Sequence, residues 1–318
     1  MAEPVFVPVE ARPERRPFLG YAMVMTAATL WAVNGTVSKV ILTSGLSSQR
    51  LAEVRSTGAF GLLAIALLIL NPRALRLRRR EVPYFVLFGG AGLALVQWLY
   101  FVAIRRLEIG IALLIQYLAP VIVALWARYV FHEPVRRRIW VALALALAGL
   151  AFVVEIWSGL TLDAAGVSAA LAGAGAYALY LLLAEHRVGE RDPISLVCFG
   201  FLFASILWAV AQPWWGFPFH LVGSARGALL GAGVVTVGTL LPFTCMVAAL
   251  RLIPAPRAAV VATLEPVLAA VFAWLLHGEV LAAPQVAGGA VVLAAVVWVQ
   301  AHRPDVAAES APPGGRRR

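Results

Sequence analysis

The sequence contains few charged residues. Asp, Glu, Lys and Arg make up 13% of its 318 residues, which is about half of their usual share in a soluble domain. Hydrophobic residues make up 62%. This composition excludes a soluble enzyme and a disordered chain, since both require far more polar surface. It predicts a protein that lies almost entirely in a membrane, where helices of about 20 apolar residues span the bilayer.

Several chemical signatures are also missing. The two cysteines, Cys198 and Cys245, lie within apolar runs, so neither a disulfide framework nor a cysteine metal site is expected. The chain has no Gly-rich Walker loop, His–Glu zinc motif or Ser nucleophile elbow. We therefore expect no ATP hydrolysis, no enzymatic activity, and no cofactor or metal. The only lysine, Lys39, lies at the end of an apolar run, which argues against a retinal protein.

Ten apolar runs of helix length are separated by short clusters of charged residues, Pro and Gly. Because backbone amides in hydrocarbon must be bonded within their own segment, each run is predicted to be a transmembrane helix. The predicted fold class is therefore an all-α integral membrane protein. Its predicted tails are residues 1–17 and 302–318, and the C-terminal tail is expected to be disordered. The ten predicted spans are 18–38, 52–70, 82–104, 108–130, 139–157, 164–184, 193–212, 227–250, 256–276 and 281–301.

The positive charges are distributed unevenly between the loops. With ten spans, 19 Lys and Arg residues fall on the side that holds both tails and 5 on the other, which predicts cytoplasmic termini. The arginines form short clusters between apolar runs, a pattern that disfavours nucleic acid as a partner and favours lipid. Abundant Arg and Ala are typical of a GC-rich bacterial genome, so the predicted location is a bacterial inner membrane.

The chain contains an internal repeat. A shift of 146 residues aligns the two halves without a gap over the third to fifth spans, and the same shift places Trp31 on Tyr177. Each unit (18–157 and 164–301, hereafter the first and second unit) has five spans, so the second must enter the membrane in the opposite orientation. Inverted repeats are typical of secondary transporters, whose substrate sites lie near the midplane between the repeats. The most informative matches are Gly92 with Gly238, Arg105 with Arg251, Pro120 with Pro266, and Glu133 with Glu279.

The segments around Leu264-Glu265-Pro266 and Gly278-Glu279, with a degenerate copy at Gln116–Pro120 and His132-Glu133, resemble the EamA family of the drug/metabolite transporter superfamily. The resemblance covers both units. It implies ten helices, cytoplasmic termini and export of small metabolites, often amino acids. It also implies a central cavity lined mainly by spans 1, 3, 4, 6, 8 and 9. Ala119 stands where the second unit has Glu265, so no pair of acidic residues spans the two halves.

Few polar or aromatic side chains lie deep within the spans, and these are the candidate cavity residues. Glu265 is the acidic residue nearest the middle of a span, where burial of a carboxylate is costly. It would bind a substrate amine or carry a coupling proton; the alternative is a protonated Glu bonded to carbonyls freed by Pro266. The predicted cavity residues are Trp31, Asn34, Gln97, Trp98, Tyr100, Gln116, Tyr117, Tyr177, Tyr180, Thr244 and Glu265.

Three prolines, Pro120, Pro242 and Pro266, interrupt spans 4, 8 and 9, as hinges or as static kinks. Residues with structural rather than chemical roles are expected at the span ends. Near the start of span 2, Glu53 and Arg55 do not share a helix face and are expected to snorkel to the membrane surface. The predicted structural residues at span ends are Arg105, Glu133, Arg251 and Glu279.

The sequence thus predicts a secondary active transporter that works by alternating access around a midplane cavity. Its predicted activity is the export of small metabolites, with amino acids, related compounds and drugs as the candidate cargoes. A facilitative channel and a non-transporting membrane scaffold are the alternatives. An intramembrane enzyme would need a second titratable group deep in the spans beside Glu265, and none was identified. The partners are a small-molecule substrate and lipid; a proton is one candidate coupling ion. The sequence does not determine the substrate, the direction of transport or the oligomeric state, for which a homodimer is one candidate.

Overall fold

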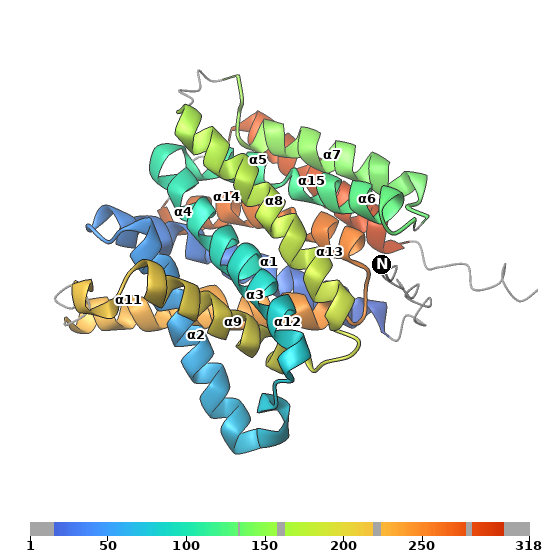
Figure 1. Cartoon of the computed structure of the whole chain (residues 1–318). Helices are drawn as coiled ribbons and strands as arrows, with labels where there is room; N and C mark the ends of the chain where they lie inside the picture. The colour runs from blue at the N-terminus through green and yellow to red at the C-terminus, as the bar shows by residue number, and fades with distance from the viewer. Residues whose placement is uncertain (1–15, 133, 158–162, 219–223, 278–281, 302–318) are drawn as a thin grey trace, which may run out of the picture.

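The computed structural model describes residues 16–132, 134–157, 163–218, 224–277 and 282–301, and every regular element within these ranges is helical (Figure 1). Segments η3 and η5 are π-helices, whereas η1, η2 and η4 are 3₁₀ turns. The elements are α1 (Pro17–Thr43), α2 (Ser48–Leu70), η1 (Pro72–Leu75), η2 (Arg79–Glu81), α3 (Val82–Val86), η3 (Leu87–Ala94), α4 (Leu95–Arg106), α5 (Ile109–Gln116), α6 (Ala119–Tyr129), α7 (Arg137–Val153), α8 (Ala164–Arg187), α9 (Pro193–Ala211), η4 (Trp214–Gly216), α11 (Ala225–Val235), η5 (Thr236–Leu240), α12 (Leu241–Ala249), α13 (Ala255–Ala262), α14 (Leu264–His277) and α15 (Ala283–Ala301).

The predicted fold class is confirmed. Within the described ranges, nine helical segments are long and apolar enough to cross a membrane. The remaining predicted span, 139–157, corresponds to α7, which has 17 residues and ends at Val153. The helix stops short of the predicted end because the chain leaves the helical conformation there, and Glu155 has a positive φ of 51°.

Side-chain caps begin several of these helices. The oxygen of a Ser or Asp accepts the backbone N–H three residues later, which satisfies a donor that the first turn leaves free. The capping residues are Ser47 for α2, Asp163 for α8, Asp192 for α9 and Ser224 for α11.

The two units pack against each other in a repeated pattern. Helix α1 packs on α12, and α8 packs on α4; the 146-residue shift relates the first pair to the second. Two further contacts join equivalent helices of the two units, α2 with α9 and α7 with α15. In Figure 1, α7 and α15 run side by side, although one is green and the other red. The buried core therefore lies largely between the units.

Both units contain a π-helical segment that the sequence pattern did not predict. Segment η3 lies within span 3 and η5 within span 8. The shift carries 87–94 onto 233–240, so the two segments overlap in the repeat and contain the matched glycines Gly92 and Gly238. A π turn inside a membrane helix shifts the angular register of all later residues, and such turns are frequent at functional sites.

Spans 4 and 9 are broken at equivalent positions. Span 4 leaves the α-helix at Tyr117 and resumes as α6, whereas span 9 leaves it at Thr263 and resumes as α14. Pro120 and Pro266 lie in the first turn of the resumed helices, where the missing N–H of proline leaves no hydrogen bond unmade. Pro242 likewise lies in the first turn of α12, directly after η5.

Arg50, near the start of α2, binds the chain just beyond the end of α9. Its guanidinium donates to the carbonyl oxygens of Gln212 at 2.9 Å and Pro213 at 3.1 Å. It also pairs with Glu53 at 2.7 Å. The Glu53 side chain is fully buried, so the prediction that it snorkels to the membrane surface is wrong.

Arg191, just before α9, makes the equivalent contact at the opposite end of this helix pair. It donates to the carbonyl oxygen of Arg76 at 2.7 Å and to that of Ala74 at 3.3 Å, beyond the end of α2. It also pairs with Glu81 at 2.7 Å. Two arginine contacts thus fasten the first unit to the second, one at each end of the α2–α9 pair.

We expect Arg191→Ala to lower the thermal unfolding midpoint of the detergent-purified protein. The change leaves Glu81 without its ion-pair partner and two carbonyls without their donor, and hydrogen bonds that involve a charge are worth about 1.5–3 kcal/mol each. Arg106→Ala is the matched control, because the Arg106–Asp163 pair is long at 3.4 Å and half exposed, and such pairs contribute about 0–1 kcal/mol. Equal midpoints for the two variants would show that the Arg191 contact does not hold the units together.

Candidate functional site

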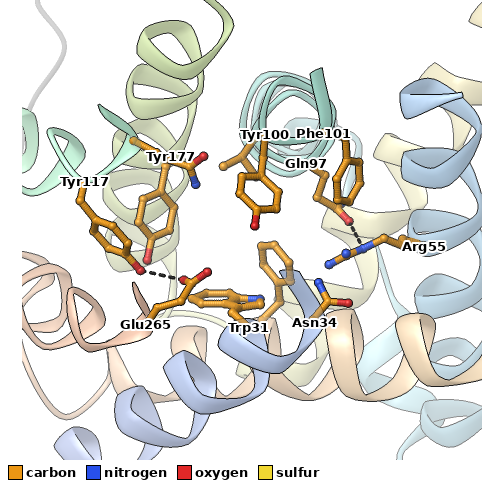
Figure 2. Close-up of a pocket in the computed structure, with 12 residues that line it drawn as sticks. Trp31, Asn34, Arg55, Gln97, Tyr100, Phe101, Tyr117, Tyr177 and Glu265 are labelled. Atoms are coloured by element: carbon orange, nitrogen blue, oxygen red, sulfur yellow. Dashed lines mark hydrogen bonds between the residues drawn. The ribbon is translucent and has the colours of Figure 1, made fainter. Parts of the chain in front are cut away.

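A cavity of about 50 Å³ lies between the two units, with room for a few water molecules. Side chains from α1, α2, α4, α5, α8, α12 and α14 line it, together with the residue at the break in span 4 (Figure 2). All six spans that the family resemblance implied contribute, and span 2 is an addition. The predicted residues that the structure brings together on the wall are Trp31, Asn34, Gln97, Tyr100, Gln116, Tyr117, Tyr177 and Glu265.

Glu265 lies in the first turn of α14, immediately after the break in span 9. Its side chain is buried, and its Oε2 accepts a hydrogen bond of 2.7 Å from the Tyr117 hydroxyl. Tyr117 lies at the break in span 4, so this bond joins the two broken spans. The partial positive charge at the start of a helix offsets part of the cost of burying a carboxylate there.

The alternative interpretation of Glu265 predicts a different hydrogen-bond partner. A protonated carboxyl that stabilises the turn would donate to a carbonyl freed by Pro266. Among the described residues, the hydrogen bond found for Glu265 is the one it accepts from Tyr117. The geometry therefore presents Glu265 as an acceptor that faces a cavity.

Arg55 is the residue that sequence reasoning placed wrongly. It was expected to snorkel to the membrane surface, but it is 3% exposed and lines the cavity. Its Nε donates to Gln97 Oε1 at 3.0 Å, Nη1 to Ser38 Oγ at 3.3 Å, and Nη2 to the carbonyl oxygen of Gly238 at 2.7 Å. The guanidinium also lies 5.0 Å from the centre of the Phe101 ring. The signal that could have identified it was an arginine inside the predicted span 52–70.

The aromatic wall joins the two units across the repeat axis. Trp31 and Tyr177, which the 146-residue shift equates, meet edge to face at 6.3 Å between ring centres. Trp31 also contacts Phe243 at 5.2 Å, and Tyr177 contacts Tyr117 at 6.5 Å. Trp31 and Tyr177 therefore face the same cavity, as their equivalence in the repeat predicted.

Several polar atoms on this wall lack a hydrogen-bond partner within the described residues. They are the hydroxyls of Tyr100 and Tyr177 and the Oε1 of Gln116, all buried. Buried polar atoms are nearly always bonded, to protein or to ordered water. These atoms therefore point to a polar occupant of the cavity, either water or a polar solute.

The structure does not place three predicted residues on the cavity wall. Trp98 turns away from its neighbour Gln97 and packs edge to face on Trp208 of α9, 6.1 Å between ring centres. Tyr180 is fully buried in the aromatic core, stacked on Tyr177 at 6.0 Å. Thr244 is half-buried and absent from the lining. Trp98 and Thr244 directly follow the wall residues Gln97 and Phe243, and successive helical residues point about 100° apart, so these two face another direction.

The predicted structural residues lie away from the cavity. Arg105 is exposed in the last turn of α4, and Arg251 is exposed two residues after α12. Glu133 and Glu279 lie outside the described residues. No cluster of three or more metal-ligating His, Cys, Asp or Glu side chains occurs in the part of the chain that the structure describes.

Comparison with known proteins extends over both units. The model of the EamA-like transporter family matches residues 18–155 and 164–300. The chain is 29% identical to a threonine/homoserine exporter, RhtA, of Salmonella typhimurium strain SL1344, over 73% of this chain and 77% of the exporter. It is 25% identical to an uncharacterized transporter, YwfM, of Bacillus subtilis strain 168, over 87% of this chain and 92% of the relative.

A solved crystal structure has the same fold, with a TM-score of 0.74 over 89% of this chain and 96% of the other, at 18% identity. These two relatives are named as an exporter and a transporter, and both come from bacteria. The two family matches cover nearly the whole of both five-span units, including the broken spans that carry Tyr117 and Glu265. The chain therefore belongs to the EamA-like transporter family and is a multi-pass membrane transporter.

Proposed function

We propose that this protein is a secondary active transporter that exports small metabolites, amino acids or related compounds, by alternating access around the cavity between its two units. One observation carries the proposal: the cavity lies where the broken spans of the two units meet, at the Tyr117–Glu265 hydrogen bond. Broken helices that end at a shared polar site are the usual substrate-binding arrangement in transporters built from inverted repeats.

The backbone supports a change of conformation during transport, because regular α-helix is interrupted within both units. The π segments η3 and η5 and the breaks in spans 4 and 9 are the places where the backbone departs from a regular helix, and we propose that the units hinge there.

The likeness to the threonine/homoserine exporters supports both the cargo class and the direction. The excess of Lys and Arg on one side supports cytoplasmic termini in a bacterial inner membrane. The contacts of Arg191 support the same topology, since they bring the loop after span 2 and the loop before span 7 to one end of the bundle. Proton coupling through Glu265 is part of the proposal.

Solute counterflow in proteoliposomes tests the proposal. We expect vesicles preloaded with unlabelled L-threonine to accumulate labelled L-threonine transiently, with saturable initial rates, and protein-free vesicles not to do so. A carrier gives this result because each turnover exchanges one labelled solute molecule outside for one unlabelled molecule inside. Flux that rises linearly with concentration, without counterflow, would instead indicate the facilitative channel. No flux of any amino acid tested would contradict the proposed cargo.

A further inference from the structure

The cavity has two charged ends, and they carry opposite charges. Figure 2 shows Glu265 and Tyr117 on one side and Arg55 on the other, with Trp31 and Tyr100 between them. Both charged side chains are buried, at 8% and 3% exposure. Neither forms an ion pair among the described residues. Two buried charges that share a cavity without touching are costly, because each has lost most of its water.

The opposite charges come from different units, and neither has a counterpart in the repeat. The 146-residue shift places Arg55 on Phe201 and Ala119 on Glu265. The first unit therefore supplies only the cation and the second unit only the anion. The fold accepts an uncharged residue at both equivalent positions, so its architecture does not require either charge.

The surroundings of Arg55 show the same difference between the units. Its neighbours Gln97 and Asn34 correspond in the repeat to Phe243 and Tyr180. In the second unit these equivalents form an aromatic cluster, with Phe243 packed on Phe201 at 5.6 Å and on Tyr180 at 5.4 Å between ring centres. An apolar cluster would cost less at this depth. The polar set in the first unit therefore calls for an explanation other than packing.

Arg55 also has hydrogen-bond donors that no described residue accepts. A guanidinium has five N–H groups in a planar fork that matches a carboxylate. Three of the five are engaged, by Gln97, Ser38 and the carbonyl of Gly238. These bonds fix the side chain in place and leave a further N–H on each of the two terminal nitrogens. At the opposite end, Glu265 and the unbonded hydroxyl of Tyr177 offer acceptors to an ammonium group.

We propose that Arg55 binds the carboxylate of a small zwitterion of α-amino-acid size whose ammonium group is bound by Glu265. This inference rests on the proposed function and deepens it, because it assigns a substrate-binding role to Arg55 and an orientation to the substrate. The carboxylate faces the end formed by α2 and α4 of the first unit. The ammonium faces the end formed by α14 of the second unit. Since each unit holds one pole, both must close on the ligand for the two charges to be neutralised.

Competition binding with charge-blocked analogues tests the assignment. The detergent-purified full-length protein is first screened with the proteinogenic amino acids, and the best-bound one is labelled. Its methyl ester lacks the carboxylate, and its N-acetyl derivative lacks the ammonium. We expect each analogue to bind the unmodified protein at least about tenfold more weakly than the amino acid, because each leaves one buried charge without its partner. Binding of no amino acid, or equal binding of all three compounds, would overturn the proposal.

Variants at the two poles separate the roles. Arg55→Gln is expected to abolish discrimination against the methyl ester and to keep discrimination against the N-acetyl derivative; Glu265→Gln is expected to do the reverse. Arg105→Gln and Glu108→Gln remove the same charges at exposed positions and should leave both ratios unchanged. If Arg55→Gln is not monodisperse, Arg55→Lys retains the charge but not the fork, and we expect it to discriminate less well against the ester.

The outcome distinguishes this inference from the proposed function. Counterflow of an amino acid, combined with an Arg55 variant that rejects the methyl ester as well as the unmodified protein does, would overturn the role of Arg55 and leave the transporter assignment standing. If none of the amino acids tested shows counterflow, the proposed cargo class itself is contradicted.

Discussion

Glu265→Gln is expected to reduce the flux of labelled L-threonine into proteoliposomes by at least about tenfold, while the protein still inserts and purifies in a single folded form. Glutamine keeps the shape of the side chain and can accept the hydrogen bond from Tyr117, but it lacks the negative charge. Loss of a charge-assisted bond to a buried ligand costs about 1.5–3 kcal/mol, which corresponds to roughly tenfold or more in binding. Initial rates at several substrate concentrations measure the effect.

Two further variants serve as controls for this result. Tyr117→Phe removes one hydrogen bond to Glu265 and keeps the charge, so we expect a smaller loss of flux than for Glu265→Gln. Glu108→Gln removes a carboxylate at an exposed position and should transport normally. If Glu265→Gln transports at the unmodified rate at every pH tested, Glu265 neither binds the substrate nor carries a coupling proton, and its role is structural.

Gly288→Ala is expected to destabilise the contact between α7 and α15 strongly. A β-carbon at position 288 would lie 2.4 Å from the carbonyl oxygen of Gly149 and 2.7 Å from Cβ of Phe152. The obstruction is backbone, which cannot rotate away, so the two helices must move apart. Overpacking of this kind costs about 1–3 kcal/mol and occasionally more. We expect a clearly lower thermal unfolding midpoint in detergent.

The next residue provides the matched control. A β-carbon at Gly289 would meet its nearest neighbour, Val267 Cγ1, at 3.4 Å, which is ordinary contact. Because alanine is a better helix former than glycine by about 1 kcal/mol, Gly289→Ala should leave the midpoint unchanged or raise it. A similar fall for both variants would mean that the loss comes from the helix itself and not from the close approach of α7 and α15.

Much of the fold could be predicted from hydropathy and the repeat. The apolar runs correspond to the described helical segments, and the shift of 146 residues correctly equates the paired contacts of α1 with α12 and of α8 with α4. The π turns in spans 3 and 8 were missed. Nothing in local composition separates a π turn from an α turn, because the same apolar residues satisfy both and neighbouring helices decide between them.

The cavity was predictable in part. Trp31 and Tyr177 were found because their equivalence in the repeat and their depth both follow from the sequence, and Glu265 because an acidic residue in a membrane span is costly. Arg55 was missed because its distance from the end of the span allowed a long side chain to reach the membrane surface. Its true environment depends on Gly238, a residue 183 positions away.

The sequence by itself determined that the chain is a membrane protein of two inverted units and that few polar side chains remain at depth. The summed hydropathy of each run determines whether it inserts into the membrane. Because each unit has an odd number of spans, the two units must have opposite orientations. Only the tertiary structure decided which side of each helix faces the protein. The second half of α2, residues 59–70, is apolar on every side, so the sequence there does not record which side faces the protein. The packing of α2 against α4, α9 and η5 turns Arg55 toward the cavity and sets it opposite Glu265.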